Sequence, residues 1–399
     1  MKERLLLKKY SLTKCSAILV YIAIVLLALS DTGFQLLILT NIGPYSRSLR
    51  LTALTLLLVK ILLTRYSKKE FFILAPIAAL SLYNYSVSGN IYCIYNILLI
   101  ACLKDVDFSL LFKTLFWSTF ASVILMGILS YLGISSVVSI TDDFGRDVIE
   151  TRYCFGLYHP NIWHFAVTRC IVYFCIAYYP RLNLIHIGSL FILNFLAFKL
   201  SVSRTSLLAA SIFLVLVFCY KYLKPAMHCV VTRACMFFGL LAIYRFFLIV
   251  YYDFITTYSV DAQVFDYRLT TGRIRQASIF LANHPIRWIG GRFPDDGTLF
   301  DCGFLRVFYE SGYLLAGLFF LLFFAVVAIA LMKNWDIVVP VAIYFVFYSL
   351  YEMDPVTRST FNVVIYFFAL LLYKPVAESF SSYLSLPKKK KVKHSHFFK

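Results

Sequence analysis

The stretch GFLRVFYESGYLLAGLFFLLFFAVVAIALM, residues 303–332, decides the fold class of this chain. Its second half, from Gly312 onward, carries no charge, and Lys333 follows it directly. A helix of about 20 apolar residues crosses the hydrocarbon core of a bilayer. The stretch therefore predicts a membrane-spanning helix, and similar apolar runs recur from residue 15 to residue 373.

Composition extends this prediction to the whole chain. Of the 399 residues, 61% are hydrophobic, 18% are aromatic and only 15% are charged, and the mean hydropathy is +0.79. These values exclude an ordinary soluble domain. We expect an all-α, polytopic helical bundle with about 12 transmembrane helices. The bundle forms one integral membrane domain over residues 1–399.

The predicted spans, each placed to within several residues, are 15–38, 48–64, 70–88, 90–103, 110–134, 159–180, 183–200, 204–220, 230–252, 303–332, 336–351 and 359–373. Two of these differ from an ordinary span. Residues 90–103 are short for a crossing, and residues 15–38 carry Asp31, Gly33 and Gln35 near one end. Either segment could be re-entrant or broken.

Lysine distinguishes the two sides of the predicted membrane. Alternating spans place the Lys-rich termini and short loops on one face, and loops with Arg but no Lys on the other. An excess of Lys and Arg marks the cytoplasmic side, so both termini, including the basic tail at 375–399, are predicted to be cytoplasmic. This topology accounts for the net charge of +18, and nucleic acid is set aside as a partner.

The other face holds two long loops, 135–158 and 253–302. Loops of this length are usually functional or separately folded. Within the second loop, the pattern at 271–283 predicts a short amphipathic helix lying on the outer surface. Arg presents a planar fork of donors that matches phosphate and carboxylate oxygens, so the Arg-rich outer loops favour binding of an anion there.

The first candidate motif is GLYHPNIWH, residues 156–164, which follows Arg152. Pro160 suits the first turn of a helix, which places His159 at the cap and leaves backbone N–H groups facing an anion. Arg152 and His159 could then clamp a phosphate. A structural reading stays open, in which His159 only caps the helix and His164 packs against a neighbour.

The second motif is SVSRTS, residues 201–206, a polar hinge between two apolar runs. Arg204 is predicted to lie at the outer membrane edge, where an unpaired charge costs a few kcal/mol. Such an Arg tends to face an internal cavity, or it extends to the lipid headgroups instead.

The third motif is DYRLTTGRIRQ, residues 266–276. Arg268, Arg273 and Arg275 lie close together beside a predicted helix start at Thr271, which indicates a compact anion site. A surface helix that meets anionic lipid would show the same pattern.

The fourth motif is FDCGFLRVFYESG, residues 300–312. Its charged and aromatic side chains are not spaced to share one stripe of a helix, so they need not act together. Asp301 could accept a proton, but its place at the predicted helix start favours an N-cap role.

A shorter outer loop, YEMDPVTRST at 351–360, reads as a charged turn. The chain has no P-loop, no GxGxxG turn and no HExxH motif, and its outer Asp residues lack a DxD-like pair. A cytosolic nucleotide-driven reaction is therefore disfavoured, and no cofactor or metal is expected. The ten Cys residues show neither a disulfide framework nor a zinc motif.

Taken in order, these motifs resemble the Wzy-type polysaccharide polymerases, which are relatives of the O-antigen ligases. The resemblance covers residues 150–312, and the flanking helices match in hydropathy only. In the ligase branch the late helix begins with a His-Asn pair whose His is proposed to activate the acceptor. This chain has Asp301 and Cys302 there, which favours polymerase over ligase.

The resemblance implies a GT-C-like glycosyltransferase of the bacterial plasma membrane with its active site on the outer side. The donor would be a growing glycan on undecaprenyl diphosphate, and the acceptor a lipid-linked repeat unit. Transfer would be metal-independent and inverting. Membrane lipid, a chain-length regulator and a flippase are the further partners implied.

The same resemblance implies roles for individual residues. Arg204 and Arg268, assisted by Arg152 or Arg273, would hold the diphosphate. Asp301 or His159 would accept the proton of the acceptor hydroxyl. The candidates for sugar binding are Tyr158, Asn161, Trp288 and Tyr309.

Three other functions remain open at this stage. A ligase would use the same donor with a different acceptor. A flippase or other transporter would need a matching inner Arg cluster or inverted repeats, and neither is seen in the sequence. An O-acetyltransferase would handle its donor at the cytoplasmic side, whereas the His residues lie mainly in outer segments or tails.

Overall fold

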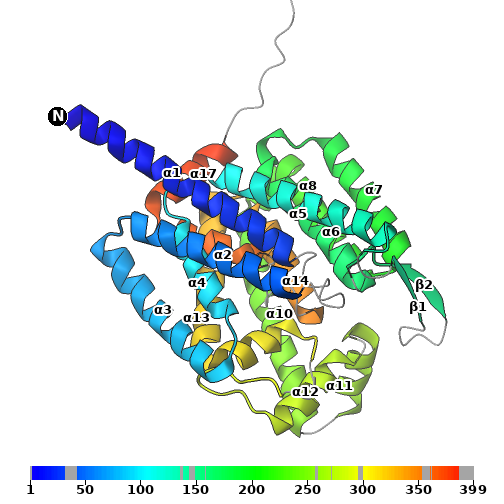
Figure 1. The fold of residues 1–399 in the computed structure, drawn as a ribbon. Helices are drawn as coiled ribbons and strands as arrows, with labels where there is room; N and C mark the ends of the chain where they lie inside the picture. Colours follow the sequence, from blue (N-terminus) through cyan, green and yellow to red (C-terminus); the bar gives the residue numbers. More distant parts are fainter. Residues whose placement is uncertain are drawn as a thin grey trace, which may run out of the picture.

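The computed structural model describes residues 2–31, 43–134, 138–142, 149–157, 159–256, 259–270, 272–294, 300–352, 360 and 362–385. Over these ranges the chain forms a bundle of α-helices with one small two-stranded hairpin (Figure 1). The prediction of a helical bundle is confirmed.

The first half of the chain contains α1 (Lys2–Leu29), α2 (Gly43–Leu63), α3 (Lys68–Ser88), α4 (Tyr92–Cys102), α5 (Phe108–Tyr131), β1 (Ser139–Asp142), β2 (Glu150–Tyr153), α6 (Pro160–Ala177), η3 (Tyr179–Arg181) and α7 (Leu184–Ser201). The second half contains α8 (Arg204–Tyr222), α9 (Lys224–Met227), α10 (Val230–Thr256), α11 (Val260–Phe265), η4 (Asp266–Thr270), α12 (Arg273–Asn283), α13 (Gly303–Lys333), α14 (Val338–Tyr351), α16 (Val363–Leu372) and α17 (Lys374–Leu384).

Six of the described helices are long and apolar enough to cross a membrane, judged by length and composition. They are α3, α5, α7, α8, α13 and the Val230–Asp253 part of α10. A seventh crossing is obtained if α16 and α17, which meet at a bend of 116°, form one broken span. The structure is therefore consistent with a multi-pass membrane protein.

Each of the twelve predicted ranges contains a helix, but the count of twelve crossings is not confirmed. α4 has only 11 residues and α14 only 14, which is too short for a straight crossing. The last part of the predicted first span, 32–38, lies outside the described residues.

Three helices in the middle of the bundle, α6, α14 and α16, are covered by other helices. Nearly every side chain of α14 and α16 is buried, and α6 is buried over most of its length. α14 packs against α8, α13 and α16, and α6 packs against α5, α7 and α8. Helices that are apolar on all sides are expected to be buried in this way.

The two predicted outer loops contain regular structure. β1 and β2 pair antiparallel within the first loop, a hairpin that the sequence did not predict. In the second loop the predicted amphipathic helix is confirmed as α12, which buries Ile274, Ala277, Phe280 and Leu281. In Figure 1, α11 and α12 lie together at the lower end of the bundle, and the hairpin lies at its right edge.

The stretch 303–332 does not form one regular helix. Gly312 has φ 73° and ψ 169°, so α13 is broken between Ser311 and Tyr313. The sequence predicted one long span here and gave no sign of the break. Backbone groups at the break make hydrogen bonds to residues distant in the sequence.

Candidate functional site

The start of α6 has the predicted cap. His159 is the N-cap residue, its Nδ1 accepts a hydrogen bond from the Asn161 N–H at 3.2 Å, and Pro160 occupies the first helical position. The ring therefore takes up one backbone N–H that an anion would otherwise contact. Tyr158, a candidate for sugar binding, lies outside the described residues.

The first two motifs are in direct contact through His164. Its ring is fully buried, and Nδ1 lies 3.0 Å from the hydroxyl of Ser201, the last residue of α7. The other ring nitrogen lies 3.0 Å from Asn194 Oδ1, within α7. The structural reading of His164, as a buried ring that packs against a neighbouring helix, is therefore the one that the structure supports.

The 201–206 hinge is connected in turn to α14. Val202 adopts a left-handed conformation with φ 54°, which ends α7, and Ser203 is the N-cap of α8. The Ser203 hydroxyl donates to Ser206 Oγ at 3.1 Å, and Ser206 Oγ lies 2.7 Å from the hydroxyl of Tyr348. The hinge is thus fixed to the last turns of α14.

The end of α14 brings the remaining motifs together. Glu352, which follows α14 directly, accepts a hydrogen bond from Arg273 at 3.0 Å. The Nε of Arg273 lies 3.9 Å from Asp301 Oδ2. The side chains of Arg273 and Glu352 are 16% and 11% exposed, whereas that of Asp301 is 47% exposed. A series of polar contacts therefore links α6, the hinge, α14, α12 and the start of α13.

The N-terminus of α12 is already bound to an anion from the protein itself. The buried Asp266 carboxylate accepts hydrogen bonds from the N–H groups of Ile274 and Arg275, at 2.9 and 3.0 Å. The helix begins at Arg273 after Gly272, not at Thr271 as predicted. The prediction that backbone N–H groups at this helix start bind an external anion is therefore wrong, because the Asp266 carboxylate already accepts their hydrogen bonds.

Two of the four candidate diphosphate ligands are accessible. Arg204 and Arg268 are exposed, and no ion pair or hydrogen bond joins either guanidinium group to another residue that the structure describes. Arg152 is buried in β2 and donates to Glu150 at 2.8 and 3.0 Å, so its charge is balanced within the hairpin. Arg273 is held between Glu352 and Asp301.

No family model, curated protein or solved structure matches this chain. The function proposed below therefore rests on the order of the motifs and on the chemistry of their side chains.

The prediction that Asp301 caps the late helix is wrong. Cys302 is the N-cap residue of α13, and its side chain makes no cap hydrogen bond. Burial raises the pKa of the Cys302 thiol to about 11, so this thiol stays protonated at neutral pH. Asp301 lies one residue earlier, and its side chain is half exposed.

The remaining sugar-binding candidates lie in different surroundings. Trp288 is 71% exposed and can present a ring face to a sugar. Tyr309 is buried, its ring contacts Phe280, Phe293 and Phe300, and its hydroxyl donates to a backbone carbonyl at 2.7 Å. The Tyr309 ring therefore has no open face in this structure, while Asn161 is half-buried at the start of α6.

A buried ionic cluster was missed by the sequence reasoning. Asp31, at the end of α1, lies 3.4 Å from Arg50 of α2 and accepts a hydrogen bond from Thr360. Arg169 is buried within α6, with its guanidinium 5.1 Å from the centre of the Phe165 ring. An ionisable residue inside a predicted membrane span indicates a functional site, and Arg50 and Arg169 both lie inside predicted spans.

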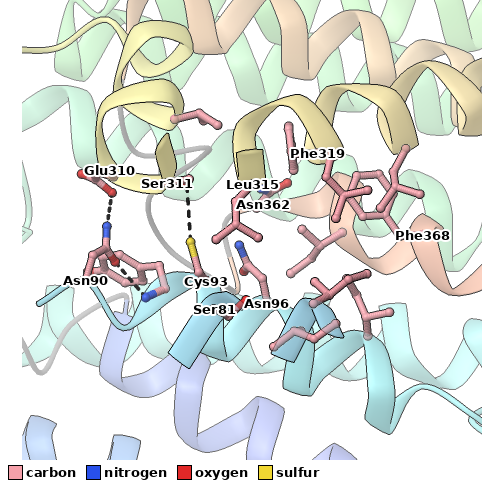
Figure 2. Close-up of a pocket in the computed structure, with 18 residues that line it drawn as sticks. Ser81, Asn90, Cys93, Asn96, Glu310, Ser311, Leu315, Phe319, Asn362 and Phe368 are labelled. Carbon is pink, nitrogen blue, oxygen red and sulfur yellow. Dashed lines mark hydrogen bonds between the residues drawn. The ribbon is translucent and has the colours of Figure 1, made fainter. Parts of the chain in front are cut away.

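A cavity of about 90 Å³ lies between α3, α4, α13 and α16 (Figure 2). At its polar end Asn90 donates to the Glu310 carboxylate, and Cys93 Sγ lies 3.3 Å from Ser311 Oγ. The remaining wall is mostly apolar. Sites for molecules of drug size usually enclose about 300–1,000 Å³, so this cavity suits a few waters and not a glycan diphosphate.

Across the described ranges, no group of three or more His, Cys, Asp or Glu side chains is placed to hold a metal ion.

Proposed function

We propose that this protein is a membrane glycosyltransferase of the polysaccharide-polymerase type. It transfers a growing glycan from undecaprenyl diphosphate to a lipid-linked repeat unit at the outer face of the bacterial plasma membrane. The transfer needs no metal, because Arg residues balance the charge of the leaving diphosphate, and it inverts the anomeric carbon.

One observation supports this proposal above all others. Motifs that are far apart in the sequence are linked by polar contacts around the last turns of α14, through His164–Ser201, Ser206–Tyr348 and Glu352–Arg273–Asp301. Charged residues that served only to orient the protein in the membrane would not need these contacts. These contacts join the 201–206 hinge, which contains Arg204, to the segments that contain Arg273 and Asp301.

The chemistry assigned to this region depends on the donor. The leaving group already carries two phosphates, so its developing charge can be stabilised by guanidinium groups that donate hydrogen bonds to it. Arg204 and Arg268 are the accessible cations for this role. Each can donate two parallel hydrogen bonds to one phosphate, which a Lys cannot do.

The acceptor hydroxyl needs a proton acceptor within hydrogen-bond reach. Asp301 is half exposed and lies beside Arg273, whereas the Nδ1 lone pair of His159 is used by the Asn161 N–H. We therefore assign Asp301 as the base, with Arg273 holding the carboxylate in place.

A test in cells separates the proposal from its alternatives. Cells that lack the protein are expected to accumulate undecaprenyl diphosphate bearing one repeat unit on the outer face, and expression of the wild-type chain restores a polymer ladder. Full-length polymer that stays on the lipid carrier would point to a ligase. Accumulation on the cytoplasmic face would point to a flippase.

A further inference from the structure

The break in α13 leaves four backbone groups without their helical partners. With Gly312 at φ 73° and ψ 169°, the N–H groups of Tyr313 and Leu314 no longer meet the carbonyls of Tyr309 and Glu310. Within a membrane each such group must find a partner in the protein.

All four groups are satisfied by contacts from outside α13. The Tyr313 and Leu314 N–H groups donate to the carbonyls of Arg287 and Trp288, at 3.0 and 3.3 Å. The carbonyl of Tyr309 accepts from the Gly291 N–H at 2.7 Å. The carbonyl of Glu310 accepts from the Asn84 side chain of α3 at 3.2 Å. Residues 287–291 thus replace the missing turn of the helix.

This close pairing explains two glycines. A Cβ at position 290 would lie 1.9 Å from the Glu310 carbonyl oxygen, and a Cβ at position 312 would lie 2.5 Å from the Trp288 carbonyl oxygen. Neither distance can be accommodated without moving backbone. The segment and the break therefore fit each other only while both positions lack a side chain.

Asn84 joins both partners with one carboxamide. It is fully buried, its Nδ2 donates to the Glu310 carbonyl, and its Oδ1 accepts from the Gly290 N–H at 2.9 Å. A carboxamide supplies a donor and an acceptor together, whereas a carboxylate supplies acceptors only. Leu, of similar size, would leave two buried backbone groups unpaired.

We propose that Asn84 is a positioning residue that holds the 287–291 segment on the break in α13. The segment follows α12, whose first residue is Arg273, and η4 before it carries Arg268. Fixing 287–291 therefore fixes the end of the outer segment that bears these two arginines. This role in positioning rests on the proposed function, but the attachment itself does not.

Loss of the attachment should lower the population of the binding-competent arrangement. Apparent affinity falls by the competent fraction, so a variant that is competent one time in ten should bind about tenfold more weakly. Amide hydrogens of Gly290, Gly291, Tyr313 and Leu314 should exchange at least tenfold faster, because their partners are lost in the open state.

The experiment compares full-length wild type with Asn84→Leu and Gly290→Ala in detergent. Hydrogen exchange is followed in peptides that cover 286–294 and 309–316, and binding is measured with undecaprenyl diphosphate alone. Ser81→Ala, one turn earlier on α3, is the local control. Val217→Ala, in the buried core of α8, is the control for general destabilisation. Both controls should leave exchange in the two peptides and affinity unchanged.

Faster exchange in both peptides together with weaker binding would support the proposal. Wild-type exchange in both Asn84→Leu and Gly290→Ala would overturn it. Faster exchange with wild-type affinity would show that Asn84 attaches the segment without positioning the arginines, and so would overturn the positioning role. If the wild type did not bind undecaprenyl diphosphate, the proposed function and the positioning role would both be overturned. The hydrogen-exchange data alone would then show whether Asn84 attaches the 287–291 segment to α13.

Discussion

At the scale of single residues, His159 owes its position to the next residue in the chain, whereas Tyr309 owes its surroundings to distant segments. The His159 cap could be predicted because Pro160 is suited to the first helical position, a preference of the backbone itself. Tyr309 was a candidate for sugar binding, yet its ring is covered by Phe280, Phe293 and Phe300. These contacts come from separate segments, which no periodicity within one helix can show.

Asp301 gives a prediction at this scale. Asp301→Asn removes the proton acceptor, and general-base catalysis contributes about 10²–10⁴-fold. We expect a loss of chain extension in that range, measured as the initial rate of dimer formation by purified protein. The Arg273–Glu352 ion pair does not involve Asp301, so the thermal melt should be close to that of the wild type.

Asp261→Asn is the matched control, because Asp261 is an exposed carboxylate on α11 of the same outer segment. It should retain the wild-type rate. An Asp301→Asn enzyme within a few-fold of the wild type would remove Asp301 from the mechanism and leave His159 as the candidate base.

At the scale of helices and strands, hydropathy located the helices but not their breaks. All twelve predicted ranges contain a helix because apolar runs are a local property of the sequence. The break at Gly312 depends on Asn84 and on residues 287–291, which are distant in sequence. The packing of α4 and α14 against neighbouring helices is likewise not visible in composition.

Two glycines of α13 test the break. Ala at position 312 would hold a left-handed backbone, at a cost of about 1–3 kcal/mol, and would also crowd the Trp288 carbonyl. Gly317→Ala is the control, because a Cβ there meets nothing within 4 Å. We expect Gly312→Ala to lower the melting temperature in detergent by several degrees. Gly317→Ala should leave it unchanged or raise it, and equal melting of the two variants would contradict the broken-helix account.

At the scale of the whole molecule, orientation in the membrane is predicted from Lys asymmetry. Cys229 lies exposed before α10, on the predicted cytoplasmic side, and Asn283 lies exposed at the end of α12, on the predicted outer side. In intact cells, an impermeant maleimide should label Asn283→Cys at once and Cys229 only after the inner membrane is permeabilised. Mass spectrometry of the labelled peptides distinguishes the two sites, and the reverse order of labelling would contradict the topology.

The whole-molecule account depends on transfer of a glycan from a lipid diphosphate with Arg as the charge-balancing group. The sequence alone suggested this through motif order, and the contacts around α14 bring those motifs together. What the sequence could not show is that Arg152 is balanced by Glu150 and that Asp266 occupies the start of α12. These two findings leave Arg204 and Arg268 as the ligands to test.

The most direct measurement is the initial rate of dimer formation by purified protein, supplied with an undecaprenyl-diphosphate-linked repeat unit in the presence of a metal chelator. The wild type should form dimer, and Arg204→Lys and Arg268→Lys should each lose about 10²–10³-fold, the usual cost of removing one oriented donor from a developing anion. Arg181→Lys, an exposed Arg of η3, should have no effect. No dimer from the wild type, or wild-type rates from both Arg204→Lys and Arg268→Lys, would contradict the account.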